Sequence, residues 1–104
     1  MDSKIVLIIM KRIIDEYLKD KLSRSEAVER LINEVDTDFI HDLDVKSNPG
    51  NFFITDCYYT IKHLTETGYE STDEEIRYFS DCLNKRCIYN LDDKNEILRN
   101  YYKI

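Results

Sequence analysis

The chain has 104 residues, of which 42% are hydrophobic and 35% are charged, and its formal net charge at pH 7 is −6. This balance excludes a disordered chain, and the length is enough for one domain with its own hydrophobic core. Two glycines and one proline are too few for an all-β fold, which uses these residues in its turns. We therefore expect one all-α domain over residues 1–104, built as an irregular bundle of five to six helices.

The first predicted element is a long helix over residues 4–22. Val6, Ile13 and Tyr17 recur at helical spacing along it. Its β-branched start, 5–9, is also compatible with a strand, but nothing nearby offers a partner strand, so we favour a helix.

The apolar run 5–10 bears on where the protein acts. It is far shorter than the roughly 20 residues that cross a bilayer. Lys11 and Arg12 follow it directly, and no small-residue cleavage site is present, so it makes a poor signal peptide. We expect a cytoplasmic protein without a membrane partner.

The second helix is predicted from a capping box. Ser23 and Glu26 have the S-x-x-E spacing in which each side chain bonds the backbone N–H of the other. This helix should run to about residue 35, and a short helix should follow over 37–43. Ser47-Asn48-Pro49-Gly50 then breaks the chain. The expected buried stripe of the second helix is Val28, Leu31, Ile32 and Val35.

Three further helices are expected after the break. Asn51 is a candidate cap for a helix that runs to about residue 67, and Gly68 suits a helix C-terminus. Thr72 and Glu75 form a second capping box, which predicts a fifth helix. A last helix should start at Asn90 or Asp92. The side chains expected to face inward from the fifth helix are Ile76, Phe79 and Leu83, with Cys82 as a further candidate.

The three cysteines and two histidines do not show the spacing of a metal site. Cys82 and Cys87 are five residues apart, which separates them by about 140° on a helix, so we expect them to diverge. An odd cysteine count favours reduced thiols over a disulfide framework. We therefore expect no catalytic residue, metal or cofactor, although a small metal-dependent or thiol-dependent enzyme remains an alternative.

Negative charge is concentrated in the middle of the sequence. Residues 34–75 hold eleven carboxylates and only two cations, whereas the rest of the chain holds ten carboxylates and thirteen cations. An acidic field of this kind repels nucleic acid and attracts basic partners. We therefore expect a protein partner with a basic surface rather than a nucleic acid.

Five of the eight tyrosines lie between residues 58 and 89, inside or beside the acidic segment. Tyrosine is frequent at interface hot spots, but it also lines the cores of small helical domains. The predicted partner-binding residues are Asp36, Asp38, Asp42, Asp44, Tyr59, Tyr69, Asp73, Glu74 and Glu75.

Short stretches of the C-terminal half combine helical aromatic residues with acids and an Asp-Cys pair. These stretches are Asp56-Cys57-Tyr58, Ile61-Lys62-His63-Leu64, Glu75 to Leu83, Tyr89-Asn90-Leu91 and Lys94-Asn95. This combination of residue types resembles that of small bacterial immunity proteins of toxin–immunity systems, such as those of contact-dependent growth inhibition. The resemblance implies a cytoplasmic protein that binds one cognate toxin domain, often a nuclease, and blocks its active site. The alternative is a regulatory or adaptor helical module, such as an antitoxin or an inhibitor that mimics nucleic acid.

Overall fold

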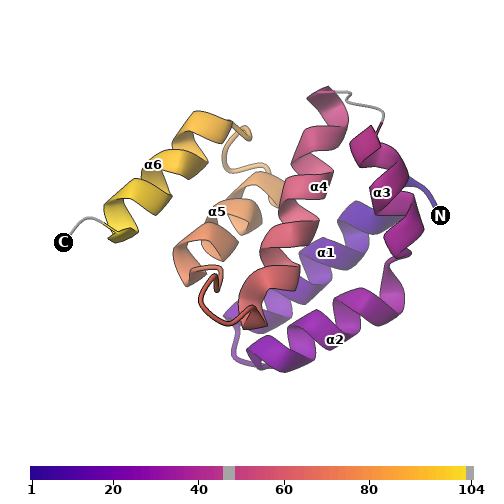
Figure 1. Cartoon of the computed structure of the whole chain (residues 1–104), viewed down its shortest axis with the longest axis horizontal. Coiled ribbons are helices and arrows are strands. Elements are labelled where there is room, and N and C mark those ends of the chain that lie inside the picture. The colour runs from indigo at the N-terminus through magenta and orange to yellow at the C-terminus, as the bar shows by residue number, and fades with distance from the viewer. Residues whose placement is uncertain (46–48, 103–104) are drawn as a thin grey trace.

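A computed structural model shows a bundle of α-helices with one 3₁₀ turn, which confirms the predicted all-α fold (Figure 1). It describes residues 1–45 and 49–102, apart from the side chains of residues 44, 45, 49–51, 98 and 100–102. No described residue belongs to a strand. The elements are α1 (Ser3–Leu18), α2 (Arg24–Glu34), α3 (Thr37–Val45), α4 (Pro49–Lys62), the 3₁₀ turn η1 (His63–Thr65), α5 (Asp73–Leu83) and α6 (Leu91–Tyr102).

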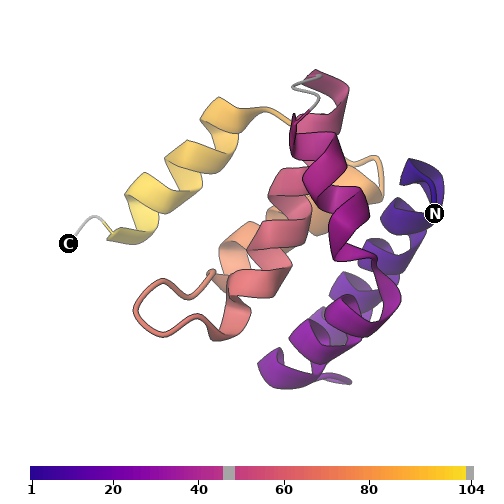
Figure 2. The same ribbon diagram turned by 45° about the vertical axis from the view of Figure 1, so that its right-hand side comes forward.

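Helix α1 packs against three other helices, α2, α4 and α5. Helix α3 packs on α4, and α2 packs on α4 and η1. The main neighbour of α6 is α5. In both views α6 lies at one edge of the molecule, on the side away from α2 and α3 (Figures 1 and 2).

The hydrophobic core draws on every helix from α1 to α5. Its largest fully buried side chains include Tyr58 of α4 and Phe79 of α5. The predicted stripe of α2 is right for Leu31 and Val35 but wrong for Ile32, which is 51% exposed. Ile32 lies next to Leu31 on the helix, so the two side chains point about 100° apart and only one faces the core centre. The remaining core residues are Val6, Met10, Ile13, Ile14, Ala27, Ile40, Leu43, Ile54, Cys57, Ile61, Leu64 and Ile76.

Both predicted capping boxes are confirmed. The Ser23 hydroxyl accepts the Glu26 N–H at 3.1 Å, and the Glu26 carboxylate accepts the Ser23 N–H at 2.9 Å. Thr72 and Glu75 repeat this reciprocal pair at 3.2 and 2.9 Å. Each box satisfies two backbone donors that a helix start would otherwise leave without partners.

The predicted end of the first helix is wrong, because α1 stops at Leu18 instead of residue 22. Asp20 adopts a left-handed conformation with φ of 60°. Its N–H bonds the Tyr17 carbonyl at 3.1 Å, and the N–H of Lys21 bonds the Glu16 carbonyl at 2.9 Å. This pair of bonds is a Schellman motif, which usually has glycine where Asp20 stands.

The start of α4 also differs from the prediction. The helix begins at Pro49, and Asn51 therefore lies inside it and is not its cap. Proline suits the first position of a helix because the missing N–H would have no helical partner there. Gly68 has φ of 85° and lies in the turn between η1 and α5. Asn90 caps α6 as expected, since its side-chain oxygen accepts the Asp92 N–H at 2.8 Å.

Candidate protein-binding surface

The acids of residues 34–75 do not form one free surface. Of the ten whose side chains the structure describes, five pair with cations of the same chain. All four cations of these pairs come from outside the segment, so folding neutralises part of the charge that the sequence concentrates there. The pairs are Glu34–Arg30, Asp56–Lys94, Asp73–Arg24, Glu74–Arg77 and Glu75–Lys94.

Asp73 belongs to an internal network that joins α1, α2 and α5. Its carboxylate accepts the Tyr17 hydroxyl at 2.6 Å and the Arg24 guanidinium at 3.0 Å. Arg24 also donates to the carbonyls of Leu64 and Ser71 at 3.2 and 2.9 Å. Burial and the bond to Asp73 raise the pKa of Tyr17. Asp73 therefore joins three helices, while 43% of its side chain stays exposed, and its role in partner binding stays a prediction.

Glu75, unlike Asp73, is buried with only 6% exposure, so it presents little charge to a partner. Its carboxylate caps α5 through Thr72 and lies 3.9 Å from the ammonium of Lys94. Glu74 is exposed but lies 3.5 Å from the Arg77 guanidinium one helical turn away. The expectation that these acids supply free negative charge is therefore wrong for Glu75 and weakened for Glu74.

Exposed carboxylates lie along α2 and α3, and Glu66 and Glu70 are exposed between η1 and α5. The predicted residues Asp36, Asp38 and Asp42 are all exposed, and the side chain of Asp44 lies outside the described residues. Glu26 and Glu29 of α2 are exposed as well, although they lie outside the acidic segment 34–75 on which the prediction rested. They lie opposite the buried side chains of α2, a pattern that helical periodicity could have shown.

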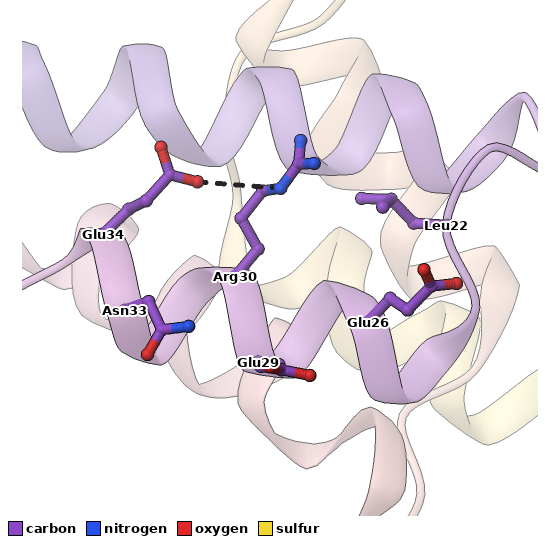
Figure 3. A pocket seen from close by; sticks show the side chains of 6 residues that line it. All are labelled: Leu22, Glu26, Glu29, Arg30, Asn33 and Glu34. Carbon is purple, nitrogen blue, oxygen red and sulfur yellow. Dashed lines mark ion pairs between the residues drawn. The ribbon is translucent and has the colours of Figure 1, made fainter.

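Figure 3 shows how the acids of α2 are arranged. Glu26, Glu29, Asn33 and Glu34 line a hollow of about 410 Å³ with Leu22 and Arg30. The one cation of this hollow, Arg30, pairs with Glu16 and with Glu34. Helix α2 therefore presents carboxylates to solvent, while Arg30 is held between Glu16 of α1 and Glu34 of α2.

A second hollow lies where α2 passes into α3 and combines apolar and acidic residues. It measures about 440 Å³, and Met1 and Ile32 contribute its large exposed apolar side chains at 54% and 51% exposure. Asp36 and Asp38 line the same hollow. The Asp36 carboxylate accepts the Asp38 N–H at 3.0 Å, which fixes the start of α3. We call the exposed residues Glu26, Glu29, Ile32, Asp36, Asp38 and Asp42 the α2–α3 surface.

The two predicted tyrosine anchors share a different hollow. Tyr59 and Tyr69 line a cleft of about 410 Å³ with His63, Lys94 and others. Tyr69 is 79% exposed, whereas the ring of Tyr59 packs edge-on against Tyr58 at 5.2 Å. None of Asp36, Asp38 and Asp42 lines this cleft, so the structure brings the tyrosines together but separates them from the α3 acids.

Sequence reasoning missed a buried polar cluster beneath this cleft. The Lys94 ammonium, in a residue only 8% exposed, lies 2.5 Å from the Asp56 carboxylate and 3.3 Å from the Thr60 hydroxyl. The Tyr89 hydroxyl donates to Asp56 at 2.6 Å, and burial together with this bond raises the pKa of Tyr89. The cluster ties α6 to α4 and α5, and no local sequence signal marks it because its members are up to 38 residues apart.

The cysteines are arranged partly against expectation. Cys57 is fully buried, and burial raises the pKa of its thiol. The predicted divergence of Cys82 and Cys87 is wrong, since their sulfur atoms are 3.3 Å apart. Helical geometry does not extend to Cys87, because α5 ends at Leu83 and Lys85 turns the chain back with φ of 61°.

In the part of the chain that the structure describes, no group of three or more His, Cys, Asp or Glu side chains could hold a metal ion. None of the described helices combines the length and apolarity needed to span a bilayer. Comparisons of the chain with protein-family models, with curated proteins and with solved structures found no match.

Proposed function

We propose that this protein is a non-enzymatic inhibitor of the immunity type, which binds a basic toxin domain such as a nuclease and covers its active site in the cytoplasm. The observation that supports this most is the uncompensated negative charge of the α2–α3 surface. The two described cations of this stretch are both engaged elsewhere, Arg24 by Asp73 and Arg30 by Glu16 and Glu34. Among the residues that the structure describes, no cation pairs with Asp36, Asp38 or Asp42, so a cationic partner would not compete with such a pair for them.

The composition of the surface suits a partner that carries both charge and apolar area. Carboxylates can pair with the lysines and arginines that a nuclease uses to hold phosphates. Ile32 and Met1 lie beside them and offer apolar contact that a purely acidic, solvated helix would lack. Tyr69 and Tyr59 supply a separate aromatic region, which a large partner could also reach.

Electrostatic steering would make association fast at low ionic strength. Screening shortens its reach to about 10 Å at 0.1 M salt, so the association rate should fall as salt is added. Contacts made by Ile32 act after docking and should control dissociation instead.

The first experiment is a rescue assay in cells. An immunity gene is expected directly downstream of its toxin gene, so the toxic domain encoded upstream is expressed with and without this protein. Restored growth together with copurification of the two chains would support the proposal. Continued growth arrest despite soluble expression of both chains would contradict it.

The second experiment tests the surface by neutralising charge without changing shape. The variant D36N/D38N/D42N removes three exposed acids and keeps a capping side chain at residue 36, because asparagine also caps helices. Its matched control, D92N/D93N/E96Q, removes three exposed acids of α6 on the other side of the molecule. We expect the first variant to slow association with the toxin domain about tenfold at low salt, and the control to leave it unchanged.

A third variant, Ile32→Ala, separates the apolar contribution from the charge contribution. It should raise the dissociation rate and leave the association rate near that of the wild type. An association rate that is equally insensitive to both triple variants would reject the α2–α3 surface as the binding site. A protein that instead binds the toxin's gene or messenger would favour the antitoxin alternative.

A further inference from the structure

The turn between α5 and α6 brings two free thiols into contact. The sulfur atoms of Cys82 and Cys87 are 3.3 Å apart. A disulfide bond measures about 2.05 Å, so the two atoms need to approach by only about 1 Å. Both residues lie at the surface edge of the bundle, Cys82 half-buried and Cys87 exposed.

A defined backbone turn holds the two thiols in this position. After Leu83 the N–H of Lys85 bonds the Cys82 carbonyl at 3.1 Å, and the N–H of Arg86 bonds the Asp81 carbonyl at 2.8 Å. These are the two bonds of a Schellman motif, and they fold the chain back over the last turn of α5. The Arg86 side chain also bonds the Asp81 carboxylate at 2.8 Å. The sulfur contact is therefore a product of the ordered turn and does not depend on a chance encounter of two loops.

We infer that Cys82 and Cys87 are a redox modification site, at which a hydroperoxide converts the two thiols into a reversible intramolecular disulfide. In the first step the Cys87 thiolate attacks the peroxide, forms a sulfenic acid and releases the alcohol or water. In the second step the Cys82 sulfur attacks the sulfenic acid, the S–S bond forms, and hydroxide leaves as water after taking the Cys82 proton. The two sulfurs together lose two electrons, which reduce one peroxide.

The surroundings assign the two roles. Cys87 is open to solvent, so a peroxide can reach it. Burial, followed by the contact with Cys87, raises the pKa of Cys82 to about 12, which keeps Cys82 a thiol during the first step. Cys57 takes no part, because it is fully buried inside the core.

The site lies next to the contact that holds the start of α6. Tyr78 contacts the Cys82 thiol through its hydroxyl. The same hydroxyl accepts the Asn90 N–H at 2.7 Å and donates to the Asn90 carbonyl at 3.1 Å. Asn90 caps α6, so a disulfide would restrain the segment that links α5 to α6.

The test is a tryptic map of the wild-type protein without reduction, after treatment with one equivalent of hydrogen peroxide and blocking of remaining thiols. Lys85 and Arg86 lie between the two cysteines, so trypsin separates them into peptides 78–85 and 87–94. We expect these two peptides to be linked in the monomer and to separate after dithiothreitol. The peptide that contains Cys57 should be recovered blocked and unlinked, as an internal control.

Two variants complete the test. Cys82→Ser should let Cys87 proceed to the sulfinic acid, and Cys87→Ser should slow the consumption of peroxide more than tenfold. Recovery of Cys87 from the wild type as a sulfinic acid, or in a disulfide between two molecules, would overturn the inference. Hydrogen exchange across residues 84–94 should slow in the oxidised protein, and unchanged exchange would overturn the proposed restraint on α6.

Discussion

Lys94 joins α6 to α4 and α5 through a buried polar cluster. Its ammonium lies 2.5 Å from Asp56 on α4 and 3.9 Å from Glu75 on α5, and it also lies 5.4 Å from the centre of the Phe79 ring. The substitution Lys94→Met keeps most of the side-chain volume and removes the charge. It should leave two largely buried carboxylates without their cation.

The expected cost follows from the burial of this cluster. Removing one partner of a buried ion pair costs roughly 3–5 kcal/mol, and the partial exposure of Asp56 places this case near 3. That is a large share of the roughly 5–15 kcal/mol by which domains are stable. A loss of about 3 kcal/mol should lower the Tm of a chain of this size by more than about 10 °C.

Urea unfolding followed by circular dichroism at 222 nm measures this loss. Arg99→Met is the matched control, because its pair with Glu96 is also on α6 but exposed, and it should cost less than about 0.5 kcal/mol. The double variant K94M/D56N should lose about 1–3 kcal/mol less than the sum of the two single variants, since the two residues are in direct contact. Additive losses, or a Lys94→Met variant as stable as Arg99→Met, would refute the role of the cluster.

Three further predictions concern the caps, the turns and the tyrosines. Thr72→Ala should lower the free energy of unfolding by about 1–2 kcal/mol, because the buried Glu75 loses its reciprocal partner, as urea unfolding would show. Lys85→Gly should raise the Tm, because glycine relieves the roughly 1 kcal/mol cost of a left-handed residue, and a lower Tm would contradict this reading of the turn. Burial raises the pKa of Tyr78 from 10.0 to about 12, so the folded state favours the protonated phenol. The stability from this group should be complete below pH 10 and lost between pH 10 and 12, which unfolding at several alkaline pH values would measure.

The helices were predictable because their signals are local. The boxes at Ser23 and Thr72 need only residues three positions apart, and both formed as the sequence indicated. Helix ends were less predictable where the left-handed residue is not glycine. Asp20 and Lys85 both have positive φ, and neither residue type by itself predicts a left-handed conformation. Because the turn at Lys85 was not predicted, the contact between Cys82 and Cys87 was not predicted either.

The pairing of the acids could not be read from the sequence, because it depends on which helices become neighbours. Arg24 and Asp73 are 49 residues apart, and Lys94 and Asp56 are 38 apart. From the sequence alone, any acid of residues 34–75 could be chosen as the ion-pair partner of Arg24 or Lys94. The exposure of Ile32 could not be read from the sequence either, because it depends on which side of α2 meets the other helices.

The charge summed over residues 34–75 and the charge that stays unpaired after folding lead to different expectations about a partner. At distances beyond the separation of an ion pair, its two charges nearly cancel, so Asp56 with Lys94 and Asp73 with Arg24 contribute little to the field outside the protein. The field that a partner meets therefore comes mainly from exposed acids outside these pairs, such as Asp36 and Asp38. At the α2–α3 surface this attraction acts over two short helices and the link between them. A partner would match it with a compact group of cations beside an apolar residue rather than with an evenly basic face.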